Sequence, residues 1–501
     1  MPRHFNLVPE PWIPVLYDDG TSGRVGWRDL IAESPRIIDV VTDPPHVYGI
    51  VVRLATAMVL RTQGAPLGEQ SPKSWRTWGE KALADGVAVA SLDAYFEEWG
   101  DRFWLLDDEH PFLQDSTIAT ECDKRASTNK FLFNVASGRN HLWWTKTLDD
   151  DAPALPFDIA AMALLAQWGY AAGGGCANRR GVPKAKQAPQ RRYSQFIPRG
   201  ANLFETLLMS CTPAFADAEF AERDVPVWEV DPGATLVPGQ MSRLTASTRG
   251  FLLFGDADGV VKVVSTWGDN QLSLDFWAAD VFMESRVAPK DREILPHRLG
   301  MTDAAWREAP AVLAERRDDA ERIPPVVLDA QRNPLGSAPA FIKSGVTVVT
   351  HFTDATGAVD LGWSRSDLPD LLGTTQEKDR KRYYEIAQFC AFTSDVLPTT
   401  QWLITKAGAE GARAVPDGDL FVRHLWSDAE ELFYGIVGGL VWSEAALDLL
   451  DRIIKRFDVA TENVSAPARL LAVLRTQRSL TGQIYKAKKK FNLINEEAEV
   501  S

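Results

Sequence analysis

The feature that most constrains the fold is a change of pattern near residue 368. From there on, helix-length segments alternate with short breakers, and polar residues suited to cap a helix precede the segments. These capping positions are held by Thr374 with Glu377, Ser427 with Glu430, Ser443, and Ser465. If the second helix begins near Asp419, about four helices occupy residues 368–501, which is the make-up of a compact bundle.

Residues 1–367 mix helical and strand patterns without a repeat. Residues 46–61 and 154–170 are apolar with spaced polar positions, which is typical of buried helices. Residues 250–264 place β-rich runs around a Gly-Asp-Ala-Asp-Gly turn, and residues 345–365 repeat this design, so both segments indicate hairpins. The predicted class is α+β: a large mixed α/β N-terminal domain followed by the C-terminal four-helix bundle.

Composition narrows the class of protein further. A length of 501 residues fits roughly two to four domains, and 45% hydrophobic with 24% charged residues is ordinary for a soluble globular chain. No apolar stretch approaches the roughly 20 residues that a membrane span needs, and the N-terminus MPRHFNLVPEPWIPV lacks the apolar core of a secretion signal. We therefore expect a cytoplasmic protein without membrane contact.

Patterns that carry catalysis are missing from the sequence. The run GGGCANRRG departs from the G-x-x-x-x-G-K-[ST] arrangement of a phosphate-binding loop, and no G-x-S-x-G occurs. The seven His are scattered and the four Cys form no C-x-x-C, so neither a nuclease metal centre nor a zinc site is indicated. We expect a protein that is not an enzyme and uses no cofactor or metal. The alternative is a nucleic-acid enzyme whose catalytic groups converge from distant segments.

One segment departs sharply from the net charge of −14. Residues 173–200, the basic segment, contain seven Arg or Lys and no Asp or Glu, and they begin with three glycines, Gly173, Gly174 and Gly175, the glycine segment. Glycine backbone can approach a narrow surface closely, and a DNA minor groove is about 6 Å wide. Flanking cations would attract phosphates regardless of base sequence. These cations are Arg179, Arg180, Lys184, Lys186, Arg191, Arg192 and Arg199.

The alternative for the basic segment is a solvent-exposed loop whose charges do nothing, with the first glycine ending the preceding helix. A second segment favours a binding site. Residues 129–146 carry four basic residues or histidines among aromatic residues, contain no carboxylate, and place Arg139 and Asn140 at a loop tip. Two such segments in an acidic chain predict parts of one nucleic-acid site.

The last predicted helix holds a third cationic run. Its cations are Arg469, Arg475, Arg478, Lys486, Lys488, Lys489 and Lys490. A solvated helix face is the favoured interpretation, and contact with a nucleic-acid backbone is the less favoured one.

Several short motifs occur in an order that points to a known family. They are FNLVPEPWIPV at the N-terminus, HPFLQD at residues 110–115, the glycine segment, and the capped helical C-terminal part. Together they resemble the CasA family, the large subunit of the type I-E CRISPR Cascade complex, over essentially the whole chain. The resemblance implies a non-catalytic subunit of an RNA-guided antiviral complex. Such a subunit recognises the protospacer-adjacent motif in duplex DNA from the minor groove, promotes strand separation and helps recruit a separate helicase-nuclease.

The resemblance also implies partners and the place where the motif is read. The expected partners are double-stranded target DNA, the Cascade subunits that hold the CRISPR RNA, and the helicase-nuclease recruited on target binding. The family's glycine loop falls on the glycine segment. Its motif-contacting loop falls on residues 133–140, with Asn134 and Asn140 as the polar readers.

A cation and a wedge complete the implied site. The family's lysine finger falls on Arg286 or Lys290, of which Arg286 is preferred. The family's wedge, a hairpin that usually carries glutamine, falls on the tip TDATG, where Ala355 and Thr356 stand and glutamine is absent. Thr356 has the place of the wedge side chain, whereas Asp354 would repel phosphates. The alternative is an ordinary hairpin turn.

The predicted DNA-binding residues form one set: Gly173, Gly174, Gly175, Asn134, Asn140, Arg139, Arg179, Arg180, Arg286, Lys290, Ala355 and Thr356. A purely structural alternative assigns the basic loops to RNA or subunit contacts that have no motif preference.

Overall fold

The structure is a computed structural model. It describes residues 3–122, 124–135, 137, 148–174, 177–182, 187–215, 223–231, 236–237, 239–268, 280–287, 294–296, 305–309, 322–331, 344–354, 356–357, 359–372, 377–406 and 413–493. Among these residues, no helix is both long enough and apolar enough to cross a membrane.

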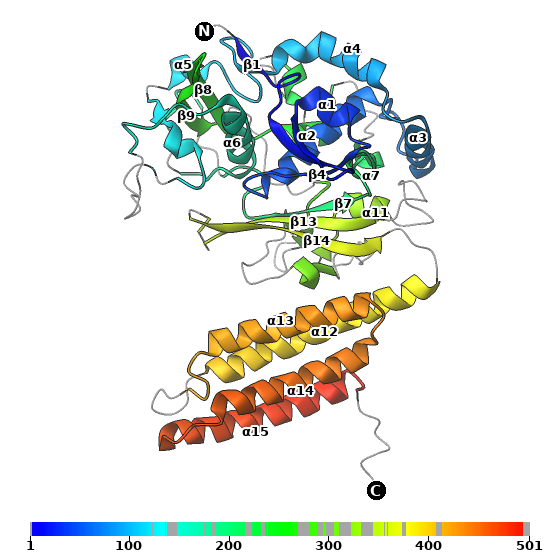
Figure 1. Ribbon diagram of the computed structural model, residues 1–501, viewed down its shortest axis with the longest axis vertical. Coiled ribbons are helices and arrows are strands. Elements are labelled where there is room, and N and C mark those ends of the chain that lie inside the picture. Colours follow the sequence, from blue (N-terminus) through cyan, green and yellow to red (C-terminus); the bar gives the residue numbers. More distant parts are fainter. Residues whose placement is uncertain are drawn as a thin grey trace. The chain divides into compact units, whose positions relative to one another are not determined.

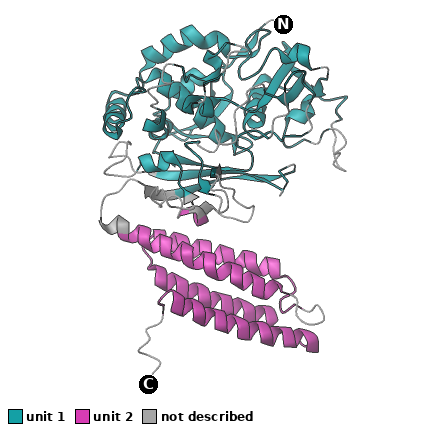
Figure 2. Cartoon of the chain, turned by 180° about the vertical axis from the view of Figure 1, so that it is seen from behind, with its two compact units in different colours: residues 1–303, 314–374 teal, residues 304–313, 375–501 magenta. Residues whose placement is uncertain are grey.

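The chain divides into two compact units (Figure 2). Unit 1 comprises residues 1–303 and 314–374, and unit 2 comprises residues 304–313 and 375–501. The sequence-based boundary after residue 367 falls inside a strand, because the pairing of that strand with its neighbour continues to Leu372. The boundary in the structure therefore lies a few residues further along the chain.

Helix α2 (Val47–Thr62) lies in the core of unit 1. Its sequence is apolar around most of its circumference, and Arg61 is its one residue that is not buried, as expected for a helix enclosed by protein. It packs against α6 (Phe157–Tyr170), which is also mostly buried. These two helices confirm the buried helices predicted over residues 46–61 and 154–170.

The remaining described helices of unit 1 are short or lie at its surface. They are α1 (Trp27–Ala32), α3 (Pro72–Asp85), α4 (Val89–Trp99), α5 (Ile118–Glu121), α7 (Leu203–Ser210), α8 (Gln240–Thr245) and α11 (Val326–Ala330).

The described strands of unit 1 form five small antiparallel sheets. Their orders are β1 (His4–Asn6) with β5 (Trp104–Leu106); β3 (Ser22–Val25), β2 (Ile13–Tyr17), β4 (Ile37–Val40); β6 (Ala126–Ser127), β9 (Gly259–Trp267), β8 (Arg249–Asp256); β14 (Asp360–Leu372), β13 (Ser344–Thr353), β7 (Ser194–Arg199); and β11 (Ile294–Pro296), β10 (Ser285–Val287), β12 (Arg322–Ile323). The β8–β9 and β13–β14 pairs confirm both predicted hairpins.

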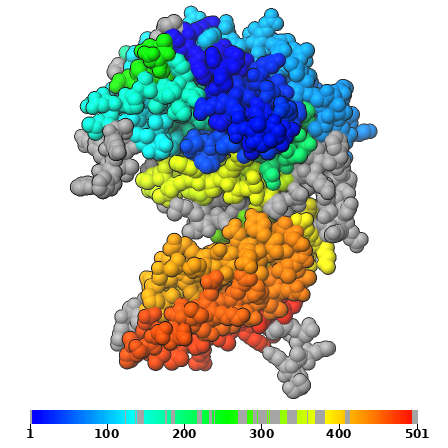
Figure 3. Space-filling view, viewed as in Figure 1, coloured from blue at the N-terminus to red at the C-terminus, as the bar shows by residue number. Residues whose placement is uncertain are grey.

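The β14–β13–β7 sheet changes the interpretation of the basic segment. Its last part, Ser194–Arg199, is strand β7, which pairs antiparallel with β13 in a register that joins Phe196 to Val348. This part is therefore buried sheet and not loop. The hairpin also packs against the N-terminal part of unit 1, since Arg365 donates to Asp39 over 2.5 Å (Figures 1 and 3).

Unit 2 is built on four long helices: α12 (Glu377–Thr405), α13 (Gly418–Val437), α14 (Trp442–Thr461) and α15 (Pro467–Lys490). They confirm the predicted helical C-terminal part, but the caps differ. The Asp417 side chain caps α13 by accepting the Leu420 N–H, whereas Ser427 lies inside that helix. Residues 304–313 belong to this unit. Trp306 is buried, and its ring centroid lies 5.1 Å from that of Phe433 in α13.

Candidate nucleic-acid interface

The glycine segment begins three residues after the end of α6 at Tyr170. Gly173 is half-buried and Gly174 is exposed, while Gly175 lies outside the described residues. A Cβ built on Gly174 would meet no atom within 4 Å, and its φ lies outside the left-handed region. The fold of the chain itself therefore does not require glycine at position 174. The remaining reason for a glycine at this position is that it lets a molecule outside the chain approach the backbone closely.

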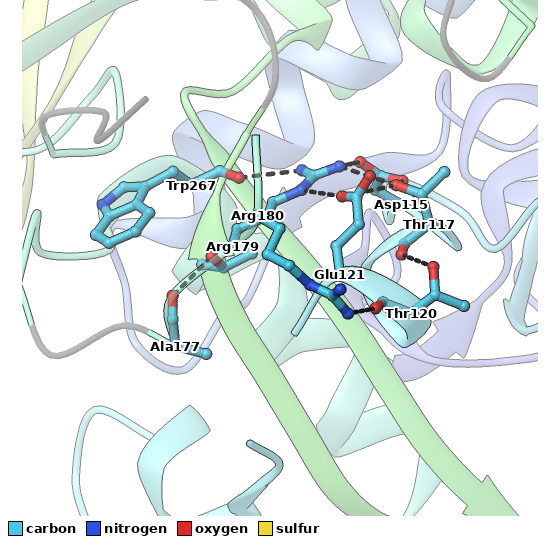
Figure 4. Close-up of polar contacts among 9 residues, drawn as sticks. Asp115, Thr117, Thr120, Glu121, Ala177, Arg179, Arg180 and Trp267 are labelled. Atoms are coloured by element: carbon cyan, nitrogen blue, oxygen red, sulfur yellow. Dashed lines mark hydrogen bonds and ion pairs between the residues drawn. The ribbon is translucent and has the colours of Figure 1, made fainter. Parts of the chain in front are cut away.

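Arg179 is buried, in contrast to the surface position that its sequence context predicts. Its Nε lies 2.6 Å from Glu121, and its Nη2 lies 2.6 Å from Asp115, on and just before α5 (Figure 4). Its Nη1 donates to the Trp267 carbonyl over 3.1 Å. Although burial lowers the pKa of Arg179, the two carboxylates outweigh this effect and raise it above its ordinary value. With 2% of its side chain exposed, Arg179 fixes the chain after the glycine segment and offers no surface to a phosphate.

Arg180 points the other way. It is exposed, and its Nη2 donates to the Thr120 carbonyl over 2.9 Å (Figure 4). Its guanidinium remains accessible at the surface where the basic segment begins. Of these two adjacent arginines, Arg180 is the one whose side chain is exposed.

Arg191 lies in the second half of the basic segment and is fully buried. Its Nη1 lies 2.7 Å from the Tyr170 carbonyl and 2.7 Å from the Asp360 carboxylate, and its Nε donates to the Gly357 carbonyl over 3.0 Å. Burial lowers the pKa of Arg191 although Asp360 opposes this effect. This cation therefore also has internal partners instead of a free surface.

The hairpin tip, residues 354–359, is closed by Asp354. Its carboxylate accepts the Val359 N–H over 2.9 Å and the Thr356 hydroxyl, so it faces the turn. These bonds hold the Asp354 carboxylate against the turn, and the expectation that its charge repels phosphates stays a prediction. Thr356 is exposed at the tip, and Ala355 lies outside the described residues.

Five side chains form a cluster beneath the tip, which we call the histidine cluster: His46, Phe133, Tyr170, His351 and Trp363. The His46 ring lies 4.3 Å from Tyr170, 5.3 Å from His351 and 5.2 Å from Trp363, measured between ring centroids. Phe133 closes the cluster at 5.8 Å from His46. The histidines are scattered along the sequence, yet the fold brings two of them together: His46 at the start of α2 and His351 on β13.

Burial keeps both histidines of the cluster neutral. Desolvation, with His351 and Arg191 nearby, holds the pKa of His46 well below its usual range. Desolvation also lowers the pKa of His351, although its Nε2 lies 3.0 Å from Asp360. Burial alone would raise the pKa of Asp360, but His351 and Arg191 outweigh it, so its carboxylate stays ionised beside Arg191.

The cluster joins three of the predicted site segments. Phe133 immediately precedes Asn134, which is exposed in the turn after a short 3-10 helix. Tyr170 is the last residue of α6, three residues before Gly173, and His351 and Trp363 belong to the hairpin. The loop that holds Asn134, the helix end that leads to the glycine segment, and the hairpin therefore meet at one group of rings, of which His46, Tyr170 and His351 are buried.

The other predicted residues are placed elsewhere or not described. Arg286 is exposed on β10, between β11 and β12. Arg139, Asn140 and Lys290 lie outside the described residues.

Sequence reasoning missed His46, Arg191 as an anchor, and Asp360. Their partners come from distant segments, and no local spacing marks them. Within the described part of the chain, no three His, Cys, Asp or Glu side chains are grouped so that they could hold a metal ion.

Comparisons with known proteins match this chain to one family. The family model described as CRISPR-associated protein Cse1 matches residues 6–461. A CRISPR-associated protein CasA/Cse1 of Thermus thermophilus is 31% identical over 319 residues, which are 62% of this chain and 60% of that protein's length. This chain thus spans less than two thirds of that curated relative.

Solved structures share the fold along nearly the whole chain. Thermobifida fusca Cse1 superposes with a TM-score of 0.73 at 20% identity, covering 98% of each chain. A chain from a solved CRISPR RNA-guided surveillance complex gives a TM-score of 0.78 at 22% identity, covering 96% of this chain and all of the other. With the family match extending over most of the sequence, the chain belongs to the CRISPR-associated protein Cse1 family.

Proposed function

We propose that this protein is the large, non-catalytic subunit of an RNA-guided antiviral CRISPR surveillance complex. In this role it recognises the protospacer-adjacent motif in duplex DNA from the minor groove, promotes separation of the strands below the motif, and helps recruit a separate helicase-nuclease. Its partners are the target duplex and the subunits that hold the guide RNA. Family membership supports the complex, and the site supports the way in which DNA is read.

The observation that carries the proposal is the convergence on the histidine cluster. A largely buried group of aromatic rings contacts three segments: the loop at Asn134, the helix end before the glycine segment, and the hairpin. Two of these segments present exposed residues, Asn134 and Gly174, and the hairpin presents Thr356. Recognition of a duplex by a rigid set of short contacts needs such an anchored arrangement.

Each exposed element has a distinct physical role. Gly174 has no Cβ, and the place where a Cβ would stand is open, so the chain can lie close to the edge of base pairs in a narrow groove at this point. Arg180 lies near this backbone in the sequence and can contact phosphates. Thr356 at the tip is placed to enter below the motif, where unstacking a base step costs a few kcal/mol.

Alanine at position 174 tests the groove contact. Because nothing in the chain lies within 4 Å of the added Cβ, Gly174→Ala should fold normally. In the assembled complex we expect about tenfold weaker binding of motif-bearing duplex and less than about twofold weaker binding of a pre-separated single strand, since the methyl group blocks only groove approach. Both dissociation constants can be measured by fluorescence anisotropy.

Gly68→Ala is the matched control, because Gly68 is also exposed, without a neighbour within 4 Å of an added Cβ. It should leave both affinities unchanged. Equal losses on the two DNA forms in Gly174→Ala would contradict the groove contact. Binding that is indifferent to randomised flanking trinucleotides would favour a scaffold without motif preference, and metal-dependent cleavage by the purified chain would favour an enzyme.

A further inference from the structure

We propose that Arg191 is a positioning residue that fixes the hairpin tip to the start of the glycine segment, so that both meet the duplex as one rigid unit. This inference rests on the proposed function and adds a coupling element to it. It concerns a residue that touches no DNA, since its side chain is fully buried.

The Arg191 guanidinium contacts three groups, which connect the hairpin tip to the end of α6. The Tyr170 carbonyl ends α6, three residues before the glycine segment, and lies 2.7 Å from Nη1. The Gly357 carbonyl belongs to the hairpin tip and lies 3.0 Å from Nε. The Asp360 carboxylate begins β14 and lies 2.7 Å from Nη1. A displacement of the tip away from α6 would break bonds to a buried cation, which costs more than breaking the same bonds in water.

Neighbours of Arg191 in the chain hold the same tip. A Cβ built on Gly357 would lie 2.9 Å from Arg192 Cδ and 3.1 Å from Gln187 Oε1, so the backbone of the tip is seated against these two side chains. Gly357 also has a φ of +76°, which favours glycine. Residues 187–192 thus contact the tip at several points.

The opposite side of the arrangement is anchored as well. Asp360 lies 3.0 Å from His351 Nε2 in the histidine cluster, and the basic segment continues from Arg191 into β7, which pairs with β13. Arg191 is therefore held between the sheet that carries the hairpin and the helix that leads to the glycines. A rigid connection matters because the tip can separate the strands only if the groove contact keeps its position while the duplex resists opening.

Lysine cannot reproduce this geometry. A guanidinium presents donors in several directions from a planar fork, whereas an ammonium group concentrates its donors at one point. Arg191→Lys keeps the positive charge beside Asp360 but gives up simultaneous bonds to Tyr170 and Gly357.

The test compares two DNA substrates in the assembled, guide-loaded complex. One is a fully paired motif-bearing duplex, and the other is the same duplex with the first pairs below the motif mismatched. For Arg191→Lys we expect about tenfold weaker binding to the paired duplex and less than about twofold weaker binding to the mismatched one, because only the paired duplex must be opened.

Arg365→Lys provides the matched control. Arg365 lies on the same strand β14 and makes a similar set of bonds, to Asp39 and the Val40 carbonyl, but it does not contact the tip. Its substitution should leave the ratio of the two affinities unchanged. Thermal unfolding of both variants measures any general loss of stability.

Gly357→Ala gives a second, independent displacement of the tip, and it decides the question if Arg191→Lys does not fold. It should shift the affinity ratio in the same direction. Equal losses on both substrates, or the same ratio in Arg365→Lys, would overturn the inference while a wild-type preference for the motif persists. A wild-type complex that binds motif-bearing and motif-free duplex equally would overturn the proposed function, and the inference with it.

Discussion

The basic segment and helix α15 have the same charge signature and different structures. Each contains seven Arg or Lys and no Asp or Glu, in a chain of net charge −14. In the basic segment, Arg179 and Arg191 are buried beside carboxylates from other segments. In α15, cations such as Arg475 and Arg478 are exposed. A run of like charges in the sequence therefore does not say whether those charges face solvent.

Periodicity explains the difference. The buried side of α15 consists of Ala472, Val473, Leu480, Ile484 and Ala487, so the helical repeat turns most of its cations outward. The basic segment has no such helical repeat, and its residues Ser194–Arg199 form strand β7. Two of its arginines are buried: Arg179 lies beside the carboxylates of Asp115 and Glu121, and Arg191 lies beside that of Asp360.

The largest loss of unfolding free energy that distinguishes the basic segment from α15 should come from Arg179→Ala. It leaves Asp115 and Glu121 without their cation and removes the bond to the Trp267 carbonyl. We expect unit 1 to lose about 3 kcal/mol of unfolding free energy. Urea denaturation followed by tryptophan fluorescence measures this loss. Arg180→Ala is the matched control and should change the unfolding free energy by less than about 0.5 kcal/mol; similar losses in both variants would contradict the distinction.

An intermediate effect should come from pH through the histidine cluster. The pKa of His46 and His351 is lowered in the folded state, so the unfolded chain binds more protons. The stability that the two neutral histidines contribute is therefore fully present above about pH 6.5. Below that value the free energy of unfolding falls by about 1.4 kcal/mol per pH unit for each additional proton that the unfolded chain binds. Denaturation of unit 1 between pH 7.5 and about 5 checks the sign. His46→Phe should make the slope shallower, and an unchanged slope would remove His46 from this explanation.

The smallest effect should come from Arg478→Ala on α15. Arg478 is exposed on a solvated face, so we expect the unfolding free energy of unit 2 to change by less than about 0.5 kcal/mol. The salt dependence of DNA binding by the complex should also stay the same. A shallower salt dependence would instead make α15 a backbone-contacting surface.

Local patterns were enough to predict several elements of the fold. Apolar periodicity located α2 and α6, and β-rich runs around glycine turns located both hairpins. Cap assignment was less successful, because Ser427 has capping spacing but lies within α13, where Asp417 begins the helix. Spacing alone does not distinguish a cap from a serine inside a helix.

The interior of the site could not be predicted, because its contacts join residues far apart in the chain. Arg191 meets Asp360 and Gly357, and His46 meets His351, through pairings that only the tertiary fold creates. The sequence correctly singled out the basic segment as unusual. It could not show that part of this segment is a buried strand and that two of its arginines have internal partners.

The turn at the hairpin tip has a consequence for protein engineering. The Thr356 hydroxyl adds one bond to the Asp354 carboxylate, but the bonds of Asp354 to Val359 and Gly357 do not involve that side chain, so they remain when residue 356 is replaced. Residues of graded length can therefore be installed there, from alanine to glutamine, on an unchanged scaffold. Under the proposed wedge role, such a series would vary how deeply the tip enters the duplex.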